Sequence, residues 1–319
     1  LDSVYDCRMV CGKLNIPFFI VDFSDTFKET VIENFKSEYL NGRTPNPCVL
    51  CNTKIKWETF LNKCREFGAD YIATGHYAKI VNDPDTNRYS VQQGDYSKKD
   101  QSYALWGLSQ DALAHTLLPL GSYTKPEVRE IAAKYGFRTA HKAESMEICF
   151  VKDNNYHRFL KDAIPELEKQ VKDGAIIDKD GKFIKKSDGY PFYTIGQRKG
   201  LGGGYNEPMY VVNVDAKANT VTVGSKSDLF SDGLVAEQVN FQKIDRISKP
   251  MRAFVKIRYN DQLESATIEQ IDDQHVKINF DKPRLSVSPG QSTVFYDENK
   301  QLIGGGIIQS GFKISHVNA

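Results

Sequence analysis

The sequence predicts an α/β protein whose first half is built around a parallel sheet and whose second half consists of antiparallel β-structure. Up to about residue 150, apolar runs typical of buried strands alternate with segments of helical periodicity. Beyond that point cysteine disappears, and short β runs are separated by turn signals such as DKDGK. We therefore expect an α/β domain at residues 1–149, a small adaptor at 150–213 and a terminal antiparallel β-domain at 214–319.

The elements of the first domain follow from apolar periodicity and from helix stop signals. Asn41-Gly42 and Gly68 are typical helix ends, and IPFFIVDF is a compact apolar run suited to a buried strand. HKAESMEICFV is expected to end in a short apolar strand that carries Cys149. In chain order we expect a helix at 1–15, a strand at 16–23, helices at 26–42 and 51–68, and a strand at 69–81 that includes Gly75-His76.

Composition excludes several classes of protein. The 319 residues include 42 Lys and Arg against 41 Asp and Glu, so the net charge of +1 gives no global basic field for nucleic acid. A polyanionic ligand would need local basic patches. No apolar run reaches the ~18–20 residues of a membrane span, so we expect no membrane association. Six cysteines in a chain of this length do not form a dense disulfide framework, which favours a reducing, cytoplasmic location.

The stretch NGRTPNPCVLCNTKIKW contains a CxxC pair, Cys48 and Cys51, and leaves several interpretations open. A structural zinc site needs four ligands, and no second pair follows. A dithiol redox motif would open a helix directly after a strand, whereas this pair follows a Pro-rich loop. A turn with small filler cysteines is one interpretation. The other is a reactive thiol near a helix N-terminus, where Lys54 and Lys56 would favour the thiolate over an unperturbed pKa of ~8.5.

Other stretches combine polar, cationic and aromatic side chains, and each also has an ordinary structural explanation. Asp100 in KKDQSYALW could simply cap a helix, and Cys149 could be a core residue. GYPFYTIGQRKGLGGGY mixes cations, flat rings and glycines, which suits an RNA backbone and splayed bases. VKIRYND and SVSPGQSTVFY are, taken alone, a strand with an outward Arg258 and a turn ahead of Gln291.

Together these stretches resemble one family, the tRNA-specific 2-thiouridylases. The matching words are GRTPNPCVLCNTKIKW, ADYIATGHYAKI, KDQSYALWGL, EICFV, GQRKGLGGG, KIRYND and SPGQSTVFYDENKQLIGGGII, in the order of the family and over nearly the whole chain. The resemblance implies an ATP-pyrophosphatase domain of the adenine nucleotide alpha-hydrolase type, an adaptor and a C-terminal β-barrel. It also implies transfer of sulfur to C2 of the wobble uridine, U34, of tRNA.

The resemblance assigns roles to particular residues. It makes Cys149 the persulfide carrier and Cys51 the second catalytic thiol, so the fold must bring the two together; a disulfide between them requires Cα atoms within ~7 Å. It makes Gly75 an ATP contact. The target base would contact Asn46, Pro47 and Cys48, and the rest of the tRNA would contact His76, Lys99, Asp100, Gln101, Arg258, Tyr259 and Gln291.

The resemblance also implies ATP with Mg²⁺, and as partners tRNA and a sulfur-donor protein, either a cysteine desulfurase or a relay protein. The SGGxDS loop with which the family cradles ATP phosphates does not occur in this sequence, so we expect a strand, loop and helix to precede residue 1. Cys48, Cys51 and Cys149 could alternatively ligate an iron–sulfur cluster. The other functions to consider are a non-catalytic tRNA-binding protein and another tRNA-modifying enzyme of the ATP-pyrophosphatase type.

Overall fold

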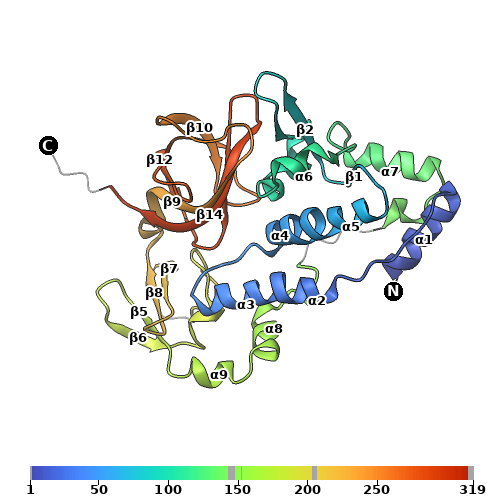
Figure 1. Cartoon of the computed structure of the whole chain (residues 1–319). Coiled ribbons are helices and arrows are strands. Elements are labelled where there is room, and N and C mark those ends of the chain that lie inside the picture. Colours follow the sequence, from blue (N-terminus) through green and yellow to red (C-terminus); the bar gives the residue numbers. More distant parts are fainter. Residues whose placement is uncertain (1, 143–147, 152, 203–206, 315–319) are drawn as a thin grey trace.

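A computed structural model describes residues 2–142, 148–151, 153–202 and 207–314 of the chain (Figure 1). Helices dominate the first half, a small sheet with two helices lies below the barrel in the view of Figure 1, and the C-terminal third forms a barrel. This arrangement agrees with the predicted change from α/β to antiparallel β-structure. None of the helices in these ranges is both long and apolar enough to span a bilayer.

Two long helices lie side by side in the N-terminal domain (Figure 1). Each is continuous but contains a π-helical segment in the middle, where i→i+5 hydrogen bonds replace the i→i+4 pattern. The predicted helices at 26–42 and 51–68 are confirmed, with Gly42 and Gly68 in the left-handed region at their ends. The helical segments are α1 (Asp2–Leu14), α2 (Ser24–Phe27), η1 (Lys28–Ile32), α3 (Glu33–Leu40), α4 (Pro47–Leu50), η2 (Cys51–Thr59) and α5 (Phe60–Glu66).

The parallel sheet of this domain is short. β1 (Ile72–Ala73) pairs in parallel with β4 (Thr116–Leu117), and the intervening chain forms the antiparallel hairpin of β2 (Ala78–Asp83) and β3 (Arg88–Gln93). The predicted strand at 69–81 is therefore two strands, interrupted at Gly75-His76. The remaining segments are η3 (Ser97–Lys99), η4 (Ser102–Leu105), α6 (Gln110–Ala114), α7 (Lys125–Lys134) and η5 (Arg138–His141).

Two predicted strands of this domain are wrong. Residues 16–23 form no strand, because the run packs through its side chains on α5 and has no backbone ladder among the described residues. Phe19 stacks on Phe67 (5.5 Å between centroids), and Phe23 meets Phe60 edge-on (6.2 Å). Cys149 lies in a turn, not a strand, and the N–H of Val151 donates to the carbonyl of Ile148 (2.9 Å) to close it.

The middle segment carries a mixed sheet in the order β6-β5-β8-β7. Because β8 pairs with both β5 and β7, the sheet is complete only at Gly224. The boundary expected between residues 213 and 214 falls inside β7, and we propose to move it to between β8 and β9. The elements are α8 (Tyr156–Ala163), α9 (Leu167–Gln170), β5 (Ala175–Ile177), β6 (Phe183–Lys186), η6 (Tyr190–Phe192), β7 (Tyr210–Asp215) and β8 (Thr220–Gly224).

The C-terminal segment is a closed antiparallel barrel in the order β10-β11-β12-β9-β14-β13. Closure leaves no free strand edge, and alternate side chains fill the interior. Its elements are η7 (Lys226–Leu229), β9 (Phe230–Phe241), β10 (Met251–Lys256), β11 (Glu264–Gln270), β12 (Val276–Leu285), β13 (Ser292–Tyr296) and β14 (Leu302–Phe312).

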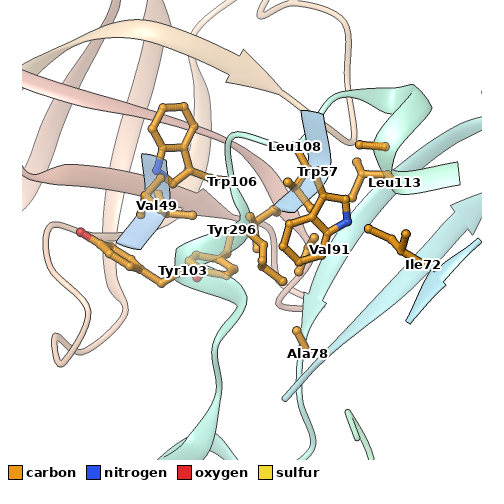
Figure 2. Packing of buried hydrophobic residues seen from close by; sticks show 14 of the residues in the cluster. Val49, Trp57, Ile72, Ala78, Val91, Tyr103, Trp106, Leu108, Leu113 and Tyr296 are labelled. Atoms are coloured by element: carbon orange, nitrogen blue, oxygen red, sulfur yellow. The ribbon is translucent and has the colours of Figure 1, made fainter. Parts of the chain in front are cut away.

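The N-terminal domain shares a hydrophobic core with the barrel (Figure 2). Trp57 of η2 and Tyr103 of η4 belong to the same buried cluster as Val294 and Tyr296 of β13. The side chain of Gln242 adds polar bonds across this contact, since its amide donates to the carbonyl of Leu105 (2.9 Å). The helix that carries Cys51 is therefore fixed relative to the barrel.

Candidate active site

The two CxxC thiols lie at the beginning of a helix whose start is set by Asn46 and Pro47. The Asn46 side chain accepts a hydrogen bond from the backbone N–H of Val49 (3.4 Å), and Pro47 occupies the first turn. Proline suits that position because the N–H it lacks would have no intrahelical partner. α4 continues without a break into η2, so Cys48 and Cys51 both project from the first turns of one long helix.

Cys149 interacts electrostatically with both thiols of this helix, although it is distant in sequence. Burial raises the pKa of Cys48 and of Cys51, and electrostatic interaction with Cys149 raises both further, while Lys56 lowers both. The raised pKa values differ from the thiolate that the sequence predicted, because burial outweighs the effect of Lys56. Lys54 is paired with Glu58 (2.7 Å). In the resting site Cys48 and Cys51 are therefore predominantly protonated thiols.

The exposure of the three thiols differs. Cys48 and Cys149 reach solvent, whereas Cys51 is partly buried. All six cysteines carry free thiols in this structure, so the disulfide implied by the resemblance is a proposed step of the reaction. In the described part of the chain, which includes all three of these cysteines, no group of His, Cys, Asp or Glu side chains could hold a metal ion. An iron–sulfur cluster on Cys48, Cys51 and Cys149 therefore stays a prediction of the sequence.

Phe150 holds the turn that carries Cys149. Its ring makes edge-on contacts with Phe27 (5.7 Å) and Phe35 (5.2 Å) of the α2–α3 helix, and a tilted contact with Phe159 of α8 (5.2 Å). Aromatic contacts of this kind add to the free energy of area burial. The Phe150 ring thus helps to anchor the turn between the N-terminal and middle segments, together with the buried Val151 and the packed Ile148.

Gly75 and His76 lie just beyond the carboxyl end of β1, where parallel sheets place their ligands. Thr74 Oγ1 is 2.8 Å from His76 Nδ1, and the imidazole centroid is 5.4 Å from the ring of Trp57. Burial, with a smaller effect of Lys56, lowers the pKa of His76 to about 4. The imidazole is therefore neutral at pH 7 and suited to hydrogen bonding rather than to ion pairing with a phosphate.

Asp100 and Gln101 face protein groups in this structure. The buried Asp100 carboxylate accepts hydrogen bonds from the Ser102 hydroxyl (2.8 Å) and from two backbone N–H groups, and burial raises its pKa. Gln101 Oε1 accepts from the N–H of Tyr77 (3.0 Å), and the Gln101 N–H donates to the Tyr77 carbonyl (2.9 Å). These bonds fix the chain directly after His76.

Arg258 and Tyr259 lie where the barrel meets the N-terminal domain. Tyr259 is 43% exposed and packs edge-on against Tyr103 (6.1 Å), while the Arg258 guanidinium donates to the carbonyl of Leu285 (3.1 Å). An exposed ring with cations around it suits a stacked base and its phosphate. Tyr259 lines a cavity of about 470 Å³ whose cationic wall consists of Lys98, Lys256 and Lys300, beside Lys99 at the end of η3.

Gln291 joins the barrel to the loop that precedes Asn46. Its amide donates to the carbonyls of Thr44 (3.0 Å) and Pro45 (3.1 Å), and the Thr44 N–H donates to the carbonyl of Pro289 (2.8 Å). Gly290 has φ +90°, and a Cβ there would lie 2.8 Å from the Thr44 oxygen, so only glycine permits this approach. The SPGQ turn therefore docks on the loop that starts the cysteine helix.

Sequence reasoning missed two residues that organise the site. The buried Tyr103 hydroxyl donates to the carbonyl of Ser292 (2.7 Å) and also bonds with the Asn46 side chain, so it links the start of the cysteine helix to the barrel. Phe150 is the other. The available signals were an aromatic residue inside KDQSYALW and one immediately after Cys149 in EICFV.

Comparison with known proteins covers nearly the whole chain. Residues 2–153 match the family described as a tRNA methyl transferase HUP domain, residues 157–225 its PRC-barrel domain, and residues 231–308 an aminomethyltransferase β-barrel domain. The tRNA-specific 2-thiouridylase MnmA of Clostridium acetobutylicum is 45% identical over 309 residues, which is 97% of this chain and 85% of the relative. The protein of that name from Amoebophilus asiaticus is 47% identical over 315 residues, 98% of this chain and 83% of the relative.

A HUP domain that is followed by a PRC-barrel domain and a closed β-barrel is the domain order of a tRNA-modifying transferase. The chain belongs to the tRNA-specific 2-thiouridylase family.

Proposed function

We propose that this enzyme uses ATP to replace the C2 oxygen of the wobble uridine, U34, of tRNA with sulfur. The observation that supports it most directly is that Cys149 interacts electrostatically with Cys51, which lies far from it in sequence. Two thiols brought together by the fold suit a reaction in which one carries a sulfur atom and the other releases it. The names of relatives that are 45–47% identical give the same reaction class.

The proposed reaction balances as follows. The uridine O2 attacks the α-phosphate of ATP, pyrophosphate leaves, and the C2–O bond acquires AMP as its leaving group. The terminal sulfur of a Cys149 persulfide attacks C2, and AMP departs. The Cys51 thiolate then attacks the Cys149 sulfur, so a Cys51–Cys149 disulfide forms and the electron pair of the broken S–S bond leaves on the sulfur of 2-thiouridine. An external dithiol reduces the disulfide before the next turnover.

The uracil and ATP are proposed to bind around the start of the cysteine helix and the end of β1. In the proposal, Asn46, Pro47 and Cys48 contact the flipped uracil, and the neutral His76 contributes hydrogen bonds to the tRNA near it. Gly75, beyond the end of β1, contacts ATP. Mg²⁺ would accompany the ATP phosphates. Within the described ranges no three His, Cys, Asp or Glu side chains form a metal site by themselves, and Mg²⁺ is usually held by substrate phosphates with one or two carboxylates.

The remaining tRNA contacts are proposed for residues of all three segments of the chain. Lys99, Asp100, Gln101, Arg258, Tyr259 and Gln291 are the assigned residues, with the exposed Arg198 and Lys199 as further phosphate contacts. Electrostatic contacts of this kind predict that affinity for tRNA falls as salt rises. The sulfur atom comes from a donor protein, a cysteine desulfurase or a relay protein, which the exposed Cys149 can meet at the surface. The need for a dithiol reductant makes the cytoplasm the proposed compartment.

The test is direct. Full-length protein is incubated with unmodified tRNA, ATP and a persulfide donor, and the nucleosides are analysed by mass spectrometry. The expected result is 2-thiouridine at position 34 only, dependent on ATP and on the donor. Tight tRNA binding without any thiolation would indicate a binding protein instead. Modification of another nucleoside would indicate a different enzyme of the ATP-pyrophosphatase type.

A further inference from the structure

Lys56 occupies a special place on the helix that carries Cys48 and Cys51. In an α-helix, with 3.6 residues per turn, a residue five positions beyond Cys51 would lie ~140° around the axis from it. η2 (Cys51–Thr59) is a π-helix instead: the N–H of Phe60 donates to the carbonyl of Ile55, and Thr59 Oγ1 donates to the carbonyl of Lys54 (2.9 Å). Both bonds span five residues. The wider turn therefore brings Lys56 much closer to the face of Cys51.

The surroundings of Lys56 differ from those of Lys54 on the same helix. Lys54 is exposed and forms an ion pair with Glu58 (2.7 Å). Lys56 is partly buried, and within the described ranges no carboxylate is paired with it. Its ammonium instead acts on Cys48, Cys51 and His76. One cation that is paired with no described carboxylate therefore acts on the thiols and on the imidazole.

This arrangement has a chemical consequence for the proposed reaction. Release of the product requires negative charge on Cys51, and burial together with the neighbouring Cys48 and Cys149 sulfurs disfavours that charge. Among the charged groups that act on Cys51, Lys56 is the one that favours the thiolate. The same ammonium disfavours protonation of His76, which keeps Lys56 as the local positive charge.

We propose that Lys56 is an electrostatic catalytic residue whose ammonium, brought to the face of Cys51 by the π-helical segment, stabilises the Cys51 thiolate that attacks the Cys149 sulfur. The proposal rests on the proposed thiolation. Lys56 neither donates nor accepts a proton in the step. The proton of Cys51 leaves to solvent before the attack, and the ammonium remains charged throughout.

The experiment compares Lys56→Met with Lys56→Arg, and uses Lys54→Met as the matched control on the same helix. Enzyme preloaded with persulfide on Cys149 is mixed with ATP and tRNA, and single-turnover formation of 2-thiouridine is measured. Lys56→Met should slow release about tenfold or more, since a nearby opposite charge is worth roughly one to three pKa units. Lys56→Arg should recover most of the rate, and Lys54→Met should match the wild type.

A second measurement separates the electrostatic role from a structural one. The rate of alkylation of Cys51 by iodoacetamide at neutral pH, followed by peptide mass spectrometry, reports the thiolate directly. It should fall in Lys56→Met and recover in Lys56→Arg, with tRNA affinity unchanged. Unchanged alkylation, equal losses in Lys56→Met and Lys54→Met, or a loss confined to tRNA affinity would overturn the inference. A wild-type enzyme that forms no 2-thiouridine while its Cys51 alkylation still depends on Lys56 would reject the proposed function alone.

Discussion

The two segments that carry the thiols of the proposed reaction, Cys51 and Cys149, are built in opposite ways. Cys51 lies on a helix that is rooted in the core shared with the barrel, where Trp57 Nε1 donates to the buried Thr116 hydroxyl (2.7 Å). Cys149 itself is exposed, on a turn that the ring of Phe150 helps to anchor. A carrier thiol must meet a donor protein at the surface, whereas a thiol that completes the reaction must be fixed beside the base. The difference in construction matches this division of labour.

The largest expected effect comes from removing each thiol in turn. Cys149→Ser should abolish both sulfur loading and thiolation, because the carrier is lost. Cys51→Ser should still load sulfur on Cys149 from the donor but should stop after attack on C2, since nothing breaks the S–S bond. Intact-protein mass spectrometry detects the loaded sulfur, and denaturing electrophoresis detects enzyme bound covalently to tRNA.

The matched control is Cys64→Ser, on α5 of the same helix but outside the thiol group. It should keep wild-type activity. If Cys51→Ser turned over normally, or if Cys149→Ser still accepted the sulfur, the roles assigned to the two segments would be wrong. If the donor loaded sulfur on Cys51 of the wild type, the roles proposed for the two segments would be exchanged.

Local signals in the sequence predicted much of the fold. Asn41-Gly42 and Gly68 end the two long helices as predicted, and turn signals predicted the hairpin of β5 and β6. Both depend on residues a few positions apart. The strand predicted at residues 16–23 failed for the opposite reason. An apolar run becomes a strand only if another strand offers its backbone, and within the described ranges none does.

The candidate site shows the same limit. Motif resemblance supplied Cys51 and Cys149, but no local pattern gives the raised pKa of Cys51, which results from burial in the folded chain. The π-helical register that redirects Lys56 is equally invisible, since its residues have ordinary helical composition. The anchoring role of Phe150 requires three aromatic partners from two helices that are far apart in sequence.

An intermediate effect is expected when the anchor of the carrier turn is removed. Phe150→Ala should lower the free energy of unfolding by about 2 kcal/mol, less than a fully buried ring, because Phe150 is partly buried. Sulfur transfer to tRNA should slow more than sulfur loading, since the exposed thiol stays accessible but is no longer held beside Cys51. Phe67→Ala, which removes a ring that is 60% exposed on α5, is the control and should change neither rate. Equal slowing of loading and transfer would contradict a positioning role.

The smallest effect is expected from Gln291→Ala, which acts on the segment that carries Cys51. The substitution removes two hydrogen bonds to the carbonyls of Thr44 and Pro45, each worth about 1 kcal/mol, and loosens the loop that starts the Cys51 helix. The structure therefore predicts a roughly tenfold lower single-turnover rate with little change in the Kd for tRNA. Gln274→Ala, on the exposed surface of the barrel, should behave as wild type. A raised Kd with an unchanged rate would instead support the tRNA contact that the family resemblance implies for Gln291, and would show that the Cys51 segment does not need this bond to stay fixed.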